Sequence, residues 1–121
     1  METEPPMRVL LVDDNEVSAE LLAEFLGLSG VQARWAGTAA QALETVGDFA
    51  PHAVVADILL PDMDGYELAR RLRENGAPLR IYALSGLSRQ ERRDEAAGLF
   101  DGWLEKPADP DALLALLRAP A

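Results

Sequence analysis

Five short, largely apolar runs alternate with five helix-like segments, and this alternation constrains the fold more than any other feature of the sequence. The predicted strands are Val9–Val12, Val31–Ala36, Ala53–Asp57, Leu79–Leu84 and Asp101–Glu105. The predicted helices cover about 16–28, a segment opening at the capping box Thr38–Gln41, about 66–74, about 88–98, and a last segment capped by Asp109. Strict alternation of this kind predicts a parallel sheet with helices on both faces.

The most apolar strands belong in the middle of such a sheet. Val9–Val12 and Ala53–Asp57 carry no charge before the final Asp57, whereas Arg34 indicates that the second strand lies at an edge. These patterns predict the sheet order 2-1-3-4-5 in a three-layer α/β sandwich. The switch point between the first and third strands is then the expected place for a site.

The first helix has its apolar residues at helical spacing. We expect one buried stripe, formed by Val17, Leu21, Leu22, Phe25 and Leu28.

Length and composition limit the function classes. A chain of 121 residues that is 49% hydrophobic forms one domain, expected at 7–119 after a disordered leader at 1–6. The net charge of −10 disfavours direct binding to nucleic acid or anionic membrane. The absence of cysteine excludes disulfides, thiol catalysis and thiolate metal sites. With no apolar run of membrane-spanning length and no signal peptide, we expect a cytoplasmic protein.

Polar residues follow four of the predicted strands. Asp13 and Asp14 follow the first strand, Asp57 ends the third, Ser85 follows the fourth and Lys106 follows the fifth. Three carboxylates at one sheet edge would raise one another's pKa unless a cation binds among them, and oxygen ligands of this kind suit Mg²⁺. A carboxylate beside a metal, a lysine and a hydroxyl is equipped to attack phosphorus and form an aspartyl phosphate.

These residues resemble the receiver domains of two-component response regulators, from about Arg8 to Leu117. The resemblance rests on Leu11–Asn15, on Asp57 followed by Leu60-Pro61 and Asp64-Gly65, on Ala83–Gly86, and on Lys106-Pro107. It implies a flavodoxin-like (βα)5 fold and a signalling function in a two-component system or phosphorelay.

The resemblance also implies roles for particular residues. Asp57 would accept a phosphoryl group from a phosphohistidine on a sensor histidine kinase or a histidine phosphotransfer protein. Mg²⁺, for which Mn²⁺ can substitute, would be held by Asp14, Asp57 and the backbone carbonyl of Leu59, with Asp13 acting through water.

Other implied roles concern the response to phosphorylation. Ser85 would swing toward the phosphoryl oxygens and Lys106 would pair with them. Trp103 takes the place of an aromatic switch residue, with a half-buried strand aromatic as the alternative interpretation.

The switching face would comprise the helix at 88–98, the fifth strand and the last helix. Leu59 and Leu87 flank the path of the hydrolytic water, so we expect slow self-hydrolysis.

The resulting expectation is a regulatory domain that catalyses only its own aspartyl phosphorylation and dephosphorylation. It would control a downstream protein target or a fused output domain. The alternative is a receiver-like scaffold that binds proteins without being phosphorylated, although Asp57 and Lys106 are both present. A dehalogenase-type phosphatase is disfavoured because Leu59 stands where a second aspartate is needed. The sequence leaves open whether the domain acts alone or within a hybrid kinase.

Overall fold

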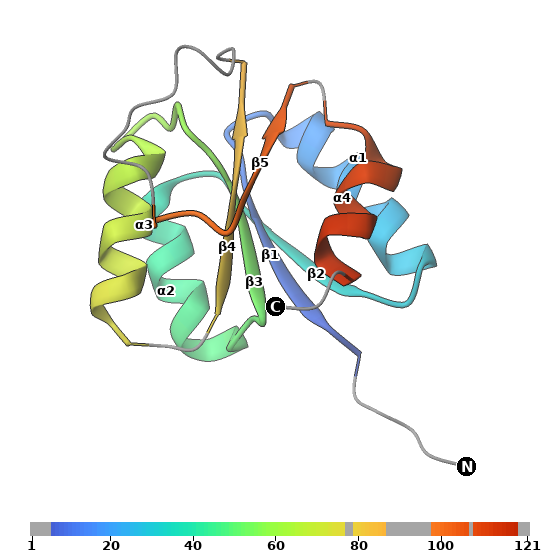
Figure 1. Cartoon of the computed structure of the whole chain (residues 1–121), viewed down its shortest axis with the longest axis horizontal. Coiled ribbons are helices and arrows are strands. Elements are labelled where there is room, and N and C mark those ends of the chain that lie inside the picture. The colour runs from blue at the N-terminus through green and yellow to red at the C-terminus, as the bar shows by residue number, and fades with distance from the viewer. Residues whose placement is uncertain (1–5, 77–78, 87–97, 107, 119–121) are drawn as a thin grey trace.

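The computed structural model describes residues 6–76, 79–86, 98–106 and 108–118 (Figure 1). Its elements are β1 (Arg8–Val12), α1 (Glu16–Leu28), β2 (Gln32–Ala36), α2 (Ala39–Phe49), β3 (Ala53–Asp57), α3 (Gly65–Glu74), β4 (Arg80–Ser85), β5 (Gly102–Glu105) and α4 (Pro110–Arg118). Five strands and four helices thus lie where the sequence predicts them. Leu87 and all but the last residue of the helix predicted at 88–98 lie outside the described residues.

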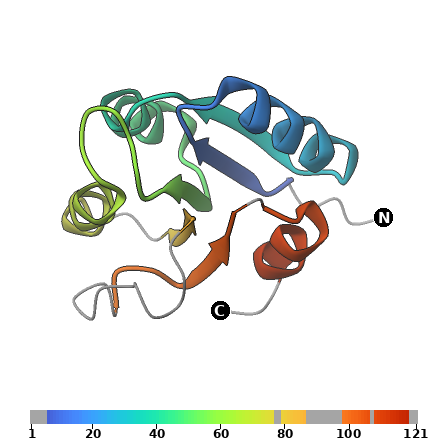
Figure 2. The same cartoon turned by 90° about the horizontal axis from the view of Figure 1, so that it is seen from above.

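The strands form one parallel sheet with the order β2-β1-β3-β4-β5, which confirms the predicted topology. Helices α1 and α4 cover one face, and α2 and α3 cover the other, so the molecule has three layers (Figures 1 and 2). All five residues of β3 are buried, as expected for a strand that helices cover on both sides. The half-exposed β2 lies at one edge and the half-exposed β5 at the other.

Alternate residues of the central strands enter two separate core clusters, because side chains in a strand point to opposite faces in turn. Leu10, Val12 and Val54 belong to the α2–α3 cluster, which also contains Leu68 and Leu72 of α3. The α1–α4 cluster is formed by Val9, Leu11, Leu22, Leu26, Val31, Ala53, Val55, Tyr82, Leu84, Leu113 and Leu117. The sheet therefore has an apolar layer on each face.

Helix α1 has the predicted bounds but does not bury the predicted stripe. Its buried residues are Ala19, Leu22 and Leu26. Val17, Leu21 and Leu28 are exposed by 67%, 63% and 84%, so the expected stripe was wrong for these three positions. Apolar residues occupy more of the circumference of α1 than the sheet can cover, so the face with Ala19, Leu22 and Leu26 is buried and the other three residues are left at the surface.

The helices that follow β1, β2 and β3 each begin with a side-chain cap. Asn15 accepts a hydrogen bond from the Ser18 N–H at 3.1 Å, and Thr38 accepts one from the Gln41 N–H at 3.1 Å. Asp64 accepts one from the Glu67 N–H at 2.8 Å. These caps fix where each connecting loop ends, at the edge of the sheet where the polar strand ends gather. None of the helices within the described ranges has the length and apolar character needed to cross a bilayer.

Candidate functional site

The carboxyl ends of four strands converge at one edge of the sheet. Asp13 follows β1, Asp57 is the last residue of β3, Ser85 is the last residue of β4 and Lys106 follows β5. Strands β1 and β3 are hydrogen-bonded neighbours, so the first and third strands meet at the predicted switch point.

Three carboxylates gather there. Asp13, Asp14 and Asp57 each offer a carboxylate oxygen, and these oxygens lie within 4.8 Å of one another. Asp13 and Asp57 are buried, with exposed fractions of 3% and 5%, whereas Asp14 faces solvent. Two buried acids and one exposed acid form a cluster that is open on one side, and hard oxygen donors in that arrangement fit a divalent cation that retains water ligands.

Lys106 connects two of these carboxylates. Its Nζ lies 2.5 Å from Oδ2 of Asp57 and 3.5 Å from Oδ2 of Asp13. Partial burial disfavours the charged amine, but the hydrogen bond and charge of Asp57, aided by the charge of Asp13, outweigh it and raise the pKa of Lys106. Lys106 is thus a fixed cation that offsets part of the negative charge of the cluster.

The sequence predicts that crowded carboxylates raise one another's pKa. At Asp13 this repulsion can be compared with the effect of burial on the pKa. Burial is the largest cause that raises the pKa of Asp13, and the charge of Asp57 adds to it. The Asn15 N–H, 2.9 Å from Oδ1, and the Lys106 ammonium offset this increase only in part. Desolvation therefore outweighs like-charge repulsion at this residue.

The loop between β3 and α3 wraps around Asp57. The Leu59 N–H donates to Oδ1 of Asp57 at 3.0 Å, and Leu59 pairs with Asp64 across the loop. The Gly65 N–H donates to the Ile58 carbonyl at 2.7 Å, and this close approach leaves no room for a Cβ at Gly65. The loop thus orients one Asp57 oxygen through its backbone, while the side chain of Leu59 is 71% exposed.

Ser85 and Trp103 lie on the β4–β5 side. Ser85 is buried, and its carbonyl accepts a hydrogen bond from the Lys106 N–H at 2.8 Å. Trp103 is half-buried, and its ring packs against Phe100 and Tyr66 at centroid distances of 5.7 and 6.4 Å. The half-buried position agrees with the structural interpretation of Trp103, and its role in switching stays a prediction.

Two residues to which the sequence analysis gave no role contact the loops of the site. The Trp35 indole N–H donates to the Asp13 carbonyl at 2.7 Å, and the Asp62 carboxylate accepts the N–H groups of Ala39 and Ala40, each at 2.9 Å. Both contacts join segments more than twenty residues apart, so no local pattern reveals them. The only available signals are a large donor at the end of an edge strand and an acid in the loop after Asp57.

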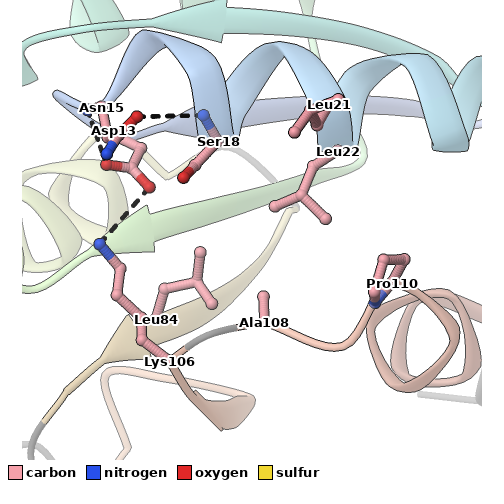
Figure 3. Close-up of a pocket in the computed structure, with 9 residues that line it drawn as sticks. All are labelled: Asp13, Asn15, Ser18, Leu21, Leu22, Leu84, Lys106, Ala108 and Pro110. Carbon is pink, nitrogen blue, oxygen red and sulfur yellow. Dashed lines mark hydrogen bonds and ion pairs between the residues drawn. The ribbon is translucent and has the colours of Figure 1, made fainter.

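A cavity of about 500 Å³ opens beside the acidic cluster, between α1 and the segment that leads to α4 (Figure 3). Asp13 and Lys106 lie at its polar end, where Asn15 and Ser18 also point (Figure 3). Its other walls are formed by Leu21, Leu22, Leu84, Ala108 and Pro110. The cavity thus combines a polar end at Asp13 and Lys106 with apolar walls.

The family model and the curated relatives that match this chain agree with each other. Residues 9–118 match the family model described as the response regulator receiver domain. The chain is 36% identical over 117 residues to the response regulator MprA of Mycobacterium sp. (strain KMS), a match that covers 94% of this chain and 50% of the relative. It is 37% identical over 116 residues to MprA of Mycobacterium leprae (strain TN), covering 93% and 50%. The chain thus spans about half the length of these curated relatives.

Solved structures agree. A CheY-like response regulator receiver domain from Methylobacillus flagellatus is similar with a TM-score of 0.84 and 32% identity, covering 93% of this chain and 97% of that one. The chemotaxis response regulator CheY4 of Vibrio cholerae is similar with a TM-score of 0.86 and 25% identity, also covering 93% and 97%.

Proposed function

Since this chain belongs to the receiver domain family of response regulators, we propose that Asp57 accepts a phosphoryl group from a phosphohistidine of a partner protein. The proposed donor is a sensor histidine kinase or a histidine phosphotransfer protein. One observation carries the proposal: Asp57 is a buried carboxylate at a strand end, and it shares the Lys106 cation with a second buried carboxylate, Asp13.

The proposed transfer uses the carboxylate as a nucleophile. An oxygen of Asp57 forms a bond to phosphorus while the bond from phosphorus to the histidine nitrogen breaks, and that nitrogen keeps the electron pair. Lys106 Nζ, 2.5 Å from Asp57, is close enough to pair with the incoming phosphoryl oxygens. Ser85, buried at the end of the neighbouring strand β4, is the proposed hydroxyl donor to the same oxygens.

The acidic cluster is the proposed Mg²⁺ site. Asp14, Asp57 and the Leu59 carbonyl would hold the ion directly, and Asp13 would act through water. The proximity of the three carboxylates supports this assignment, since Mg²⁺ prefers oxygen ligands, keeps several waters and shares these preferences with Mn²⁺. When bound, Mg²⁺ supplies positive charge that stabilises the phosphoryl oxygens during transfer.

The chain's chemistry is proposed to be limited to forming and losing its own aspartyl phosphate, as suits a regulatory domain. A phosphoryl group on Asp57 gives Lys106 and Ser85 new oxygens to contact. This change would bias β5 and α4 between two arrangements, with Trp103 as the proposed aromatic switch. The sequence analysis also assigns the segment at 88–98 to the switching face, and all but its last residue lie outside the described residues.

The proposed output partner is a downstream protein target or an output domain fused to the receiver. A protein is favoured because the net charge of −10 opposes direct contact with nucleic acid or anionic membrane. We place the domain in the cytoplasm together with its proposed phosphohistidine donor.

The test is intact-mass spectrometry after incubation with acetyl phosphate. Three samples are compared: wild type with Mg²⁺, wild type with EDTA, and Asp57→Asn with Mg²⁺. We expect the mass of one phosphoryl group to be added in the first sample alone.

Each other outcome has a definite meaning. A gain that persists in Asp57→Asn would assign the phosphoacceptor to another residue. A gain that persists in EDTA would remove Mg²⁺ from the proposal. No gain in a folded wild type would favour the receiver-like scaffold that binds proteins without phosphorylation.

A further inference from the structure

Apart from Asp57 at the end of β3, the residues proposed to hold Mg²⁺ come from two loops. Both loops contact the segment Trp35–Ala40, which runs from the end of β2 into the first turn of α2. Asp13 and Asp14 belong to the loop after β1, whereas Leu59 belongs to the loop after β3. We propose that Trp35 and Asp62 are positioning residues that hold these two loops in the geometry needed for Mg²⁺ binding. This inference rests on the proposed function and assigns roles to residues outside the ligand set.

Trp35 holds the first loop through a backbone atom. Its indole Nε1 lies 2.7 Å from the carbonyl oxygen of Asp13, and the Asp13 N–H donates to the Ala36 carbonyl at 3.1 Å. The two contacts fix both peptide groups of Asp13 against β2. The second of these groups is the peptide that joins Asp13 to Asp14. Because a peptide group is planar, the indole hydrogen bond fixes its orientation and so the position of the Asp14 Cα.

The position of the Asp14 carboxylate depends on the plane of this peptide more than the position of the Asp13 carboxylate does. The Asp13 carboxylate is buried and contacts both the Asn15 N–H and Lys106. The Asp14 carboxylate is exposed, and within the described part of the chain no hydrogen bond or ion pair orients it. Its direction therefore follows from the backbone, which the Trp35 indole holds on one side of Asp14 and the Asp13 carboxylate, through the Asn15 N–H, holds on the other.

Asp62 holds the second loop. Its two carboxylate oxygens each accept one N–H from the first turn of α2, from Ala39 and from Ala40, both at 2.9 Å. Those N–H groups lie at the positive end of the helix dipole, which favours a carboxylate there. The loop that carries Leu59 is thus attached at its far side to α2, while its near side is attached to Asp57 through the Leu59 N–H.

The contact of Asp62 is more than an ordinary helix cap. Helix α2 already has its own cap, because Thr38 accepts the Gln41 N–H at 3.1 Å and the Gln41 side chain accepts the Gly37 N–H at 2.9 Å. Thr38 and Asp62 therefore stabilise the same helix end, but of the two only Asp62 links that end to the loop after β3. This difference provides a matched control.

The experiment measures the Mg²⁺ dissociation constant of the full chain by isothermal titration calorimetry. Wild type is compared with Trp35→Phe, which keeps an aromatic ring and removes the N–H, with Asp62→Asn, and with Thr38→Ala. Outer contacts that orient metal ligands typically change metal affinity by 10- to 100-fold, so we expect Trp35→Phe to weaken binding about tenfold. We expect a loss of about threefold to tenfold for Asp62→Asn and a change below about twofold for Thr38→Ala.

A second measurement follows the Trp35 indole N–H directly. In ¹H–¹⁵N spectra the chain gives two indole signals, from Trp35 and Trp103, and Trp35→Phe identifies the first. We expect the Trp35 signal to shift on saturation with Mg²⁺, because its acceptor carbonyl lies between the ligand residues Asp13 and Asp14.

Three results would overturn the inference while wild type binds Mg²⁺: unchanged affinity in both Trp35→Phe and Asp62→Asn, an equal loss in Thr38→Ala, or a Trp35 signal that Mg²⁺ does not move. The last result is read on wild type and is independent of how any variant folds. A folded wild type that binds no Mg²⁺ overturns the proposed metal site itself, and with it the positioning roles.

Discussion

On the β2 side of the site, the contacts run from Trp35 and Asp62 to backbone atoms, whereas on the β5 side Lys106 contacts charged side chains. Backbone groups keep the same charge whether or not a phosphoryl group is present. The proposed phosphorylation would change the charge and shape of Asp57, so its contact with Lys106 would have to be rearranged. Under the proposed function, the β2 side would therefore support the geometry of the metal ligands and the β5 side would respond to the phosphoryl group.

The largest expected effect comes from breaking the responsive side. Lys106→Ala removes the cation that contacts Asp57 and Asp13, and with it the charge proposed to pair with the phosphoryl oxygens. We expect the phosphorylation rate with acetyl phosphate to fall by about 100-fold, the scale seen when one donor to a developing anion is lost. The rate is measured by intact mass over time at saturating Mg²⁺. A rate within twofold of wild type would show that Lys106 has no part in the transfer.

A second prediction concerns the packing of Gly65 against the backbone of Asp57, the residue that contacts both the loop after β3 and Lys106. A Cβ at Gly65 would lie 2.7 Å from the Asp57 carbonyl oxygen and 2.8 Å from the Ile58 Cα, both backbone atoms that cannot move aside easily. We therefore expect Gly65→Ala to lower the free energy of unfolding by about 1–3 kcal/mol in urea titrations.

The matched control is Gly47→Ala. Gly47 lies within α2, and a Cβ there meets no atom within 4 Å, so we expect a gain of about 0.5–1 kcal/mol. Equal losses in the two variants would mean that crowding behind Asp57 is not the cause.

A third prediction tests the loop after β3. Leu59 follows Asp57 by two residues, and its exposed side chain cannot orient a water molecule by hydrogen bonding. We expect Leu59→Asn to speed the loss of the phosphoryl group by about threefold to tenfold, because an amide can position the attacking water. The decay is followed by mass spectrometry after removal of the phosphodonor. Decay that is already fast in wild type, with no change in the variant, would contradict the expectation of slow self-hydrolysis.

The smallest expected effect is a pH dependence on the β2 side. The N–H groups of Ala39 and Ala40 lower the pKa of Asp62 below its ordinary value of 3.8. An acid whose pKa is lower in the folded state adds stability that is present above the unfolded pKa and is lost as the pH falls through the folded one. Urea unfolding should therefore show a stability advantage of wild type over Asp62→Asn at neutral pH that shrinks below about pH 4. An advantage that stays constant down to pH 3 would rule out the carboxylate charge as its source.

The sequence predicted the parts of the molecule that local patterns determine. Continuous apolar runs located β1 and β3, the side-chain cap Thr38 located the start of α2, and the strand ends located Asp13, Asp14, Asp57 and Lys106 at one sheet edge. The buried face of α1 was misjudged, because apolar residues occupy more of its circumference than the sheet can cover. Trp35 and Asp62 were missed because their partners are 22 and 23 residues away in the chain.

The separation of the core into an α1–α4 cluster and an α2–α3 cluster has a consequence for protein engineering. The two clusters share no buried residue within the described chain, and the sheet backbone lies between them. Substitutions at Leu26 and at Leu72, on opposite faces, should therefore have independent effects on stability that simply add. A designer could redesign the apolar layer on one face of the sheet while leaving the other layer as it is.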